Sequence, residues 1–178
     1  FYKLLYEEDK NSWIVDDYEE LAAMFDGVET TTGMSARPYI YSGSQRIGFV
    51  EYVSPGSPAA DSGIARGDII YTIDGNTLSQ ANYHSLYYQT RATFGFADWD
   101  GSQMVPNGRF VDLTAIEFNQ NPVVYDEIID YQGYKIGYLV YTQFTTGQQN
   151  EWMGELNRVL TDFKTAGVSD VVLDLRYN

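Results

Sequence analysis

The chain of 178 residues contains no cysteine, one histidine, and only 11 basic residues against 25 acidic ones. Without cysteine, disulfide bonds and thiolate metal sites are excluded. The formal charge of −14 repels nucleic acid phosphates, so nucleic acid binding is not expected. The sequence also lacks an apolar run of about 18 residues, so no membrane-spanning segment is expected. With 44% apolar residues, the chain should form a globular protein with one or two cores.

The stretch from 48 to 78 reads GFVEYVSPGSPAADSGIARGDIIYTIDGNTL. Ser57 and Pro58 predict the N-cap and first residue of a short helix over 58–62. Ile69–Ile73 is predicted to be a buried strand, and the residues Asp74-Gly75-Asn76 predict a tight turn. This order of elements, with its GSPA and GDIIYTIDG motifs, resembles the PDZ domain of bacterial proteases.

The end of the chain predicts a strand, a helix and a second strand. Tyr134–Tyr141 (YKIGYLVY) has a strand pattern. The segment 148–165 carries apolar residues at helical spacing, including Trp152, Leu156 and Phe163. Val171–Leu175 should be a buried parallel strand. The segments KIGYLVYTQF and GVSDVVLDLRYN resemble the start of the catalytic domain of carboxyl-terminal processing peptidases, also called tail-specific proteases. In that family the nucleophilic serine and its lysine base lie further downstream. The resemblance therefore implies a serine endopeptidase whose catalytic residues are absent from this chain, without a cofactor.

The predicted fold class is α+β, with a PDZ-like β-barrel carrying two helices and a βαβ unit of a ClpP/crotonase-like core. The predicted domains are an N-terminal helical arm over 1–32, a PDZ domain with a long hairpin over 33–121, and a truncated catalytic portion over 122–178. The remaining predicted elements are a helix from about Asp17 to Phe25 capped by Asp16 or Asp17, a linker over Glu29–Gly33, strands Arg37–Ser42 and Arg46–Val53, a second helix over Gln80–Arg91, and a hairpin of Ala92–Asp98 and Arg109–Phe118 around the loop Asp98–Gly108.

The PDZ resemblance implies a groove that binds an extended peptide beside the strand 37–42. A loop of four residues would receive the peptide carboxylate, although Ser35 stands where the family prefers glycine. A helix with apolar residues at a spacing of three and four would form the opposite wall, and the alternative is that this stripe belongs to the core. The predicted peptide-binding residues are Gly33, Met34, Ser35, Ala36, Tyr39, Tyr83, Leu86 and Tyr87.

Other candidate chemistry is weak. His84 lies among tyrosines with no GxSxG elbow in the sequence, so a histidine-based triad is not expected. None of the four lysines, Lys3, Lys10, Lys135 and Lys164, should be buried as the base of a serine-lysine dyad requires. Acidic clusters such as Asp98-Trp99-Asp100 lack the EF-hand pattern and should be solvated turns, so no metal site is expected.

By resemblance, Asp174, Arg176 and Asn178 support the turn that leads to the oxyanion hole; the alternative is a plain strand end. The expected partner is a polypeptide substrate, and the unpaired edge of the last strand predicts self-association or packing against the arm. A non-enzymatic PDZ scaffold and an aromatic-rich sugar-binding module are the alternative functions. Because the chain begins at Phe1, a signal peptide, a lipoprotein leader or a cloning boundary is expected before it, and a bacterial periplasmic, envelope or secreted location is the resulting expectation.

Overall fold

The computed structural model describes Ile14 and residues 17–25 and 28–178. The first helix, α1 (Tyr18–Phe25), begins where the sequence predicts it, and the Asp17 carboxylate accepts a hydrogen bond from the Glu19 N–H at 2.8 Å. This bond caps the first turn, as the acidic residue before the helix indicated. The alternative cap, Asp16, lies outside the described residues.

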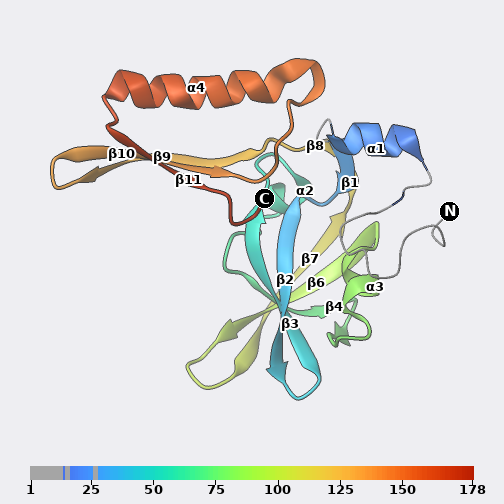
Figure 1. Cartoon of the computed structure of the whole chain (residues 1–178). Helices are drawn as coiled ribbons and strands as arrows, with labels where there is room; N and C mark the ends of the chain where they lie inside the picture. Colours follow the sequence, from blue (N-terminus) through green and yellow to red (C-terminus); the bar gives the residue numbers. More distant parts are fainter. Residues whose placement is uncertain (1–13, 15–16, 26–27) are drawn as a thin grey trace, which may run out of the picture.

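The predicted linker after α1 is wrong, because residues 28–31 form a strand. Strand β1 (Val28–Thr31) pairs antiparallel with β8 (Ile116–Asn119) in a two-stranded sheet. The partners are separated by more than eighty residues in the sequence, so no local pattern announces the pairing. Figure 1 shows this small sheet beside α1, between the two larger parts of the molecule.

A six-stranded antiparallel sheet forms most of the lower part of the molecule in Figure 1. Its strand order is β2-β3-β4-β6-β7, and the short strand β5 pairs with β4. The strand β2 begins three residues earlier than predicted, so that residues 34–36 belong to a strand rather than to a free loop. The strands are β2 (Met34–Ser42), β3 (Gln45–Val53), β4 (Ile69–Ile73), β5 (Asn76–Thr77), β6 (Arg91–Trp99) and β7 (Met104–Thr114).

The motif-rich stretch folds as its local chemistry predicts. Helix α2 (Pro58–Asp61) begins after Ser57, whose hydroxyl accepts the Ala60 N–H at 3.3 Å. Ile64 is 4% exposed and fills the core beyond the helix. The strand β4 has the predicted bounds.

The second helix is much shorter than predicted. Helix α3 covers only Tyr83–Tyr87. Before it, the Asn82 side chain accepts the Ser79 N–H at 2.7 Å and the Ser79 hydroxyl accepts the Asn82 N–H at 3.3 Å, a local turn that competes with helix. After it, β6 begins at Arg91. The helix is therefore confined between a side-chain turn and a strand.

The long hairpin forms from β6 and β7, but its loop is shorter than predicted. The Asp100 carboxylate accepts the N–H groups of Ser102 and Gln103, both at 2.8 Å, and closes the turn within 100–103. Asn107 and Gly108 lie inside β7, opposite an irregularity in the register with β6. The two residues therefore form part of a β-bulge and not of the hairpin turn.

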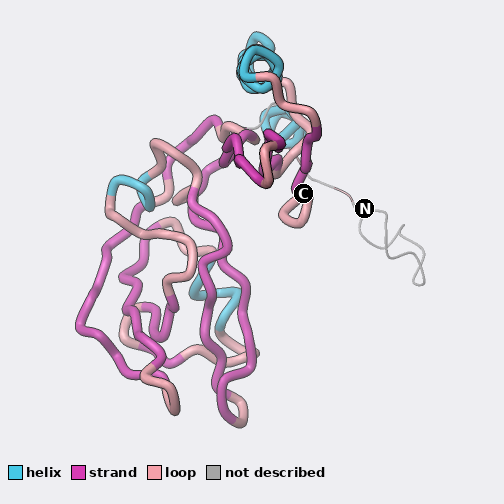
Figure 2. Tube along the Cα trace, turned by 90° about the vertical axis from the view of Figure 1, so that its left-hand side faces the viewer, coloured by secondary structure: helices cyan, strands magenta, loops and turns pink. Residues whose placement is uncertain are grey.

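The C-terminal layer contains β9 (Val123–Tyr131), β10 (Tyr134–Tyr141), a 3₁₀ turn over Gln148–Asn150, α4 (Glu151–Ala166) and β11 (Asp170–Asp174). Strand β10 pairs antiparallel with β9 and parallel with β11, which confirms the predicted order of strand, helix and parallel strand. The sequence did not predict β9. In Figure 1 and in the side view of Figure 2, α4 lies on the face of this layer that points away from the six-stranded sheet.

The prediction that the last strand is buried is wrong. Val171, Val172 and Leu173 are 51%, 50% and 49% exposed. Strand β11 pairs only with β10, so its other edge has no neighbouring strand among the described residues. A strand at the margin of a three-stranded sheet buries its side chains incompletely.

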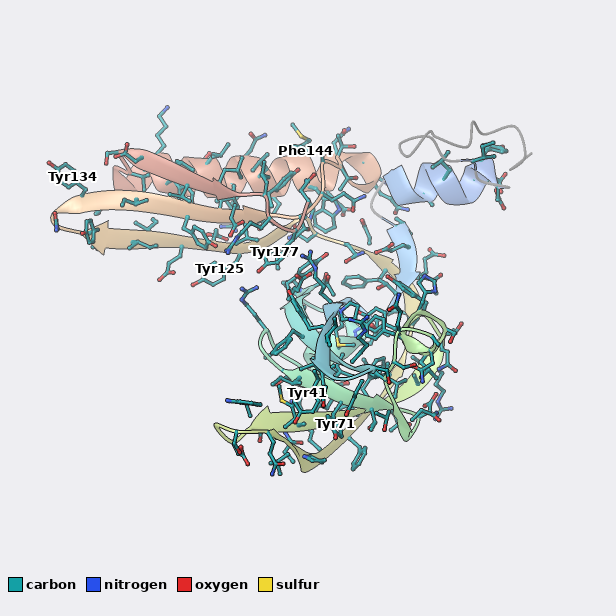
Figure 3. All side chains as sticks on the ribbon, turned by 60° about the horizontal axis from the view of Figure 1, so that its bottom comes forward. Tyr41, Tyr71, Tyr125, Tyr134, Phe144 and Tyr177 are labelled. Carbon is teal, nitrogen blue, oxygen red and sulfur yellow. The ribbon has the colours of Figure 1, made fainter. Side chains whose placement is uncertain are left out.

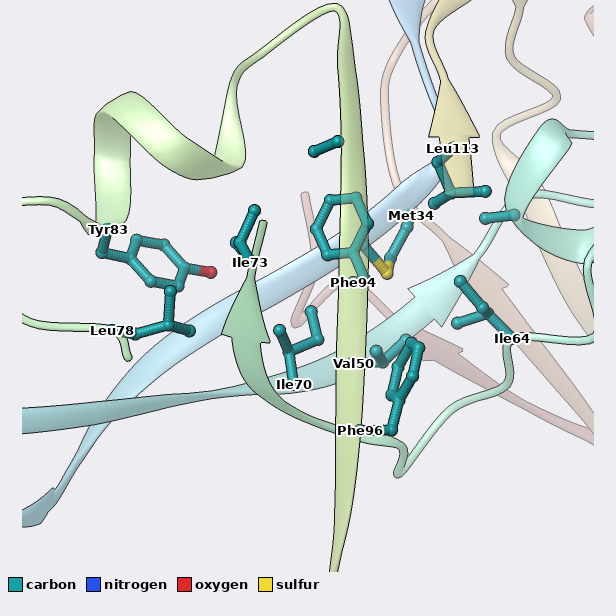
Figure 4. Packing of buried hydrophobic residues seen from close by; sticks show 12 residues of the cluster. Met34, Val50, Ile64, Ile70, Ile73, Leu78, Tyr83, Phe94, Phe96 and Leu113 are labelled. Atoms are coloured by element: carbon teal, nitrogen blue, oxygen red, sulfur yellow. The ribbon is translucent and has the colours of Figure 1, made fainter. Parts of the chain in front are cut away.

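Two separate clusters of buried side chains hold the chain together. The first lies in the six-stranded sheet with α2 and α3, and Figure 4 shows its packing around Phe94, Ile70 and Met34. The second lies between α4 and the C-terminal sheet and contains Val123, Leu139, Tyr141, Val159 and Phe163. Phe163 packs so closely on Gly137 of β10 that a Cβ atom there would lie 2.5 Å from its ring. Among the described residues, no helix has the length and apolar character needed to cross a bilayer.

Candidate functional site

One edge of β2 has no strand beside it among the described residues, because β2 is the first strand of its sheet. Ala36 of β2 pairs with Val50 of β3. The main-chain groups of Val50 point away from β2: the Val50 N–H donates to the Asp68 carbonyl at 3.0 Å, and the Val50 carbonyl accepts the Gly67 N–H at 2.9 Å. Ala36 and Val50 are therefore a non-hydrogen-bonded pair, and the main-chain groups of Ala36 point to the free edge. Pro38, two residues further, lacks an N–H, as is typical of such an edge.

Two tyrosines of α3 hold the helix against this edge. The Tyr83 hydroxyl donates to the Ala36 carbonyl at 3.1 Å, and the Tyr87 hydroxyl donates to the Met34 carbonyl at 2.5 Å. The two rings stack with centroids 5.4 Å apart. Burial raises the pKa of both phenols far above the ordinary range, so both remain neutral donors.

The predicted peptide-binding residues divide between this edge and other places. Gly33, Met34, Ser35, Ala36 and Tyr87 line one cavity of about 360 Å³. Tyr83 is only 8% exposed and belongs to the core, and Leu86 packs against that core, so the alternative interpretation of the stripe fits both residues. Tyr39 is 45% exposed and its ring meets Phe49 edge-on at 5.4 Å, away from this cavity.

The cavity contains one carboxylate, that of Glu29, and we call it the Glu29 cavity. Besides the predicted residues its walls include Tyr52, Tyr88 and Gln120, and none of the described lysine, arginine or histidine residues lines it. The Gln120 side-chain amide donates to the Glu29 carboxylate, and desolvation by burial raises the pKa of Glu29. Sequence analysis missed Glu29, Tyr52 and Gln120, because they reach the cavity from β1, β3 and the segment after β8.

Gly33 is locked at the junction between β1 and β2. Its N–H donates to the Thr31 hydroxyl at 3.0 Å, and its carbonyl accepts the Ser54 N–H at 2.8 Å. One of the four N–H groups that the predicted loop would offer to a peptide carboxylate, that of Gly33, is therefore already paired. The one charged side chain among the described wall residues is also negative, and its charge repels a second carboxylate.

The strand end at Asp174 forms a second polar cluster. Asp174 is 7% exposed, and its carboxylate accepts the Tyr138 hydroxyl at 2.6 Å, the Arg176 Nε at 2.9 Å and the Arg176 backbone N–H at 3.0 Å. The Asn178 N–H donates to the Leu175 carbonyl at 3.0 Å and closes the turn. Hydrogen bonds from Arg176, and then from Tyr138, hold the pKa of Asp174 well below its usual range. Tyr138 was not predicted as a residue of this cluster, since nothing in the sequence of a strand indicates which of its tyrosines will contact a distant aspartate.

Tyr177 joins this turn to the six-stranded sheet. Its ring lies 5.5 Å from that of Tyr52, and its hydroxyl accepts a hydrogen bond from Arg66, which also donates to the Glu51 carbonyl at 2.5 Å. A cavity of about 520 Å³ opens there, with Tyr125 and Tyr177 among its walls. Figure 3 shows both tyrosines on the side of the C-terminal layer that faces the six-stranded sheet.

Replacing Asp174 by asparagine should lower the melting temperature at neutral pH, since the amide cannot accept the Arg176 hydrogen bonds as an anion does. The pKa of the Asp174 carboxyl is lower in the folded protein than in the unfolded chain. The ionised carboxylate therefore stabilises the fold at pH values above its unfolded pKa. This stabilisation is lost as the pH falls through its folded pKa. The difference between wild type and Asp174→Asn should therefore shrink below about pH 4. Thermal unfolding at several pH values measures this difference in melting temperature. Asp170→Asn, at the exposed start of the same strand, is the control and should change little; a pH-independent difference would contradict the assignment.

Of the residues weighed as catalytic candidates, those that the structure describes line neither cavity. His84 is exposed and packs on the Tyr88 ring at 4.5 Å. Lys135 and Lys164 are exposed, and the Lys135 ammonium donates to the Ala166 carbonyl at 3.0 Å. Lys3 and Lys10 lie outside the described residues. Within those residues no group of three histidine or acidic side chains is arranged to hold a metal ion.

Comparisons with known proteins agree with this architecture. A family model described as a PDZ domain matches residues 49–86. The carboxyl-terminal-processing protease of Picosynechococcus sp. (strain ATCC 27264 / PCC 7002 / PR-6) is 31% identical over 126 residues, which are 70% of this chain and 29% of that protein. A protein assigned as an S41 protease from Bacteroides fragilis NCTC 9343 has a similar crystal structure, with a TM-score of 0.69, 27% identity, and coverage of 98% of this chain and 52% of that one.

A weaker structural likeness, with a TM-score of 0.48 and 22% identity, is to a photosystem II D1 C-terminal processing protease, over 90% of this chain and 44% of that one. The chain thus spans less than a third of the curated relative and about half of the first structural one. The chain resembles the PDZ-containing region of carboxyl-terminal processing proteases.

Proposed function

We propose that this chain is the substrate-binding, N-terminal portion of a serine endopeptidase of the carboxyl-terminal processing type. In this proposal residues 1–32 form an arm, 33–121 a PDZ-like barrel, and 122–178 the first part of a ClpP/crotonase-like catalytic core. The two separate hydrophobic clusters support the division between the last two parts. The serine and lysine that perform acyl transfer lie outside the chain, so this polypeptide alone has no peptidase activity.

The free edge of β2 carries the proposal. Strand addition needs main-chain groups that point away from the sheet, and Ala36 offers its N–H there, while its carbonyl already accepts the Tyr83 hydroxyl. The Glu29 cavity lies beside the same residues, and Tyr87 of α3 contributes to its wall. Because Pro38 lacks an N–H, a docked polypeptide pairs with the first part of β2 and not along its whole length.

The turn at Asp174, Arg176 and Asn178 has a supporting role in this proposal. Its hydrogen bonds to Tyr138 and along the turn fix the direction in which the chain leaves β11. A fixed strand end suits a segment that positions oxyanion-stabilising N–H groups in the complete protease.

The alternative is a PDZ scaffold that binds peptides without an associated peptidase. The C-terminal layer favours the protease, because a free-standing peptide-binding module has no need of a second hydrophobic core with a parallel strand pair. In this proposal the protein acts in the bacterial periplasm or at the cell envelope, and its similarity to a bacterial carboxyl-terminal-processing protease supports that location.

A proline substitution at the edge tests peptide binding. Ala36→Pro removes the outward N–H without removing a hydrogen bond between β2 and β3, and the ring obstructs a docked strand. We expect the affinity for a fluorescein-labelled ten-residue peptide ending in apolar residues to fall about tenfold, which equals about 1.4 kcal/mol. Fluorescence polarisation with the full chain measures the dissociation constant.

Ile40→Pro is the matched control. Ile40 is 67% exposed and pairs with Arg46, whose N–H donates to the Leu78 carbonyl on the far side of β3, so it occupies an equivalent outward position beyond Pro38. This variant should bind the peptide like the wild type. If Ala36→Pro retains its urea midpoint and its full affinity, peptides do not add to β2 and the proposal is wrong.

A further inference from the structure

The Glu29 cavity has the chemistry of a cation site. Among the described residues on its walls only Glu29 is charged, and Tyr52, Tyr87 and Tyr88 contribute aromatic rings. The Tyr87 and Tyr88 rings meet edge-on with centroids 5.1 Å apart. A carboxylate beside aromatic faces attracts an ammonium or guanidinium group through both its charge and the ring quadrupoles.

Within the part of the chain that the structure describes, the Glu29 carboxylate has no cationic partner in the cavity. Its described hydrogen bond comes from the neutral Gln120 amide. Arg37 of β2 pairs with Glu51 at 3.1 Å and does not line the cavity. The desolvation that raises the pKa of Glu29 would be offset by a positive group in the same space. The cavity is therefore complementary to a ligand that brings its own positive charge.

The position of the cavity decides which cation can reach it. It lies beside residues 33–36, where the free edge of β2 would pair with an extended chain. A side chain of that chain, rather than its main chain, would project beside the edge. We propose that the Glu29 cavity binds the lysine or arginine side chain of an internal segment of an extended polypeptide docked on β2. This inference rests on the proposed peptide-binding function and names the substrate class of that site.

The same features disfavour a terminal carboxylate there. The Gly33 N–H is paired with Thr31, and Glu29 repels a second negative charge. Recognition of an internal basic residue instead of a chain terminus distinguishes this site from one that reads only an apolar C-terminal residue.

The test uses ten-residue peptides that are acetylated at the N-terminus and amidated at the C-terminus, so that a side chain carries the only positive charge. Lysine is placed at each central position in turn and compared with norleucine, which has a similar length and no charge. At one register we expect the lysine peptide to bind the full chain about fivefold more tightly, the range of a partly exposed ion pair. Glu29→Gln should remove this preference, so that the lysine and norleucine peptides bind with equal affinity.

Glu117→Gln is the matched control, because Glu117 lies on the partner strand β8, opposite Thr30, and does not line the cavity. It should keep the full lysine preference. Tyr88→Leu is the second variant, since Tyr88 is 69% exposed and contributes little to the core. It should reduce the lysine preference about two- to threefold. This variant tests the cation site if Glu29→Gln fails to fold.

Each other outcome is decisive. Equal affinities for lysine and norleucine at every register, or a preference that survives in Glu29→Gln, overturn the cation site while strand addition to β2 remains. If no peptide of the series binds, the proposed peptide-binding function fails and the cation site fails with it.

Discussion

Replacing Phe163 with alanine should unfold the C-terminal layer while the six-stranded sheet stays folded. Phe163 is 3% exposed and packs on Gly137 of β10. Removing a buried phenylalanine side chain costs about 3–5 kcal/mol. The second hydrophobic cluster contains only five buried residues, so this loss is a large fraction of what stabilises the layer.

Amide hydrogen exchange distinguishes the two parts. Protection should fall across β9, β10, α4 and β11, and it should persist in β3, β4 and β6. Leu160→Ala is the matched control, because Leu160 lies on the same helix, is 43% exposed and is absent from the buried cluster. A uniform loss of protection over the whole chain would show that the two clusters unfold as one cooperative unit, which contradicts a domain boundary near residue 122.

Segments whose structure is fixed by neighbouring residues could be predicted from the sequence. The Ser57 cap, the Pro58 helix start and the bounds of β4 depend on chemistry within a few residues. The order of β10, α4 and β11 followed from apolar periodicity and from Gly167 between helix and strand. In each case local propensity and tertiary packing favour the same structure.

The errors occurred where distant segments decide the structure. The residues Val-Glu-Thr-Thr at 28–31 carry no strong strand pattern, and they form β1 because β8 lies beside them. Helix α3 is cut short by the Ser79 turn and by the start of β6. Apolar residues of β11 suggested burial, but a strand at the sheet margin has neighbours on one side only.

The candidate site shows the same division. Tyr83 and Tyr87 were predicted together because they lie one helical turn apart. Their hydroxyl contacts with β2 could not be predicted, since sequence spacing contains no information on which strand a helix meets. Glu29 and Tyr52 reach the cavity from two different sheets, so no motif joins them.

Replacing Gly33 with alanine should be among the most damaging single changes near the site. Gly33 has a φ of +75°, a conformation that costs about 1–2 kcal/mol for a residue with a Cβ atom. That Cβ would also lie 2.1 Å from the Ser57 Cβ and 2.4 Å from its hydroxyl. Ser57 is fully buried and caps α2 through Ala60, so it cannot move away without breaking a bond worth about 1 kcal/mol.

Strain, overlap and cap loss together should lower the free energy of unfolding by about 3 kcal/mol, and urea unfolding measures the change. Gly43→Ala separates the causes, because Gly43 has a φ of +55° but nothing within 4 Å of its added Cβ. That control should lose only about 1–2 kcal/mol.

Since Gly33 adjoins both β2 and the Glu29 cavity, Gly33→Ala should also weaken peptide binding under conditions in which the protein remains folded, whereas Gly43→Ala should not. Equal losses of stability in the two variants would mean that Ser57 relaxes freely, and the junction between β1 and β2 would then not be rigid enough to shape the cavity.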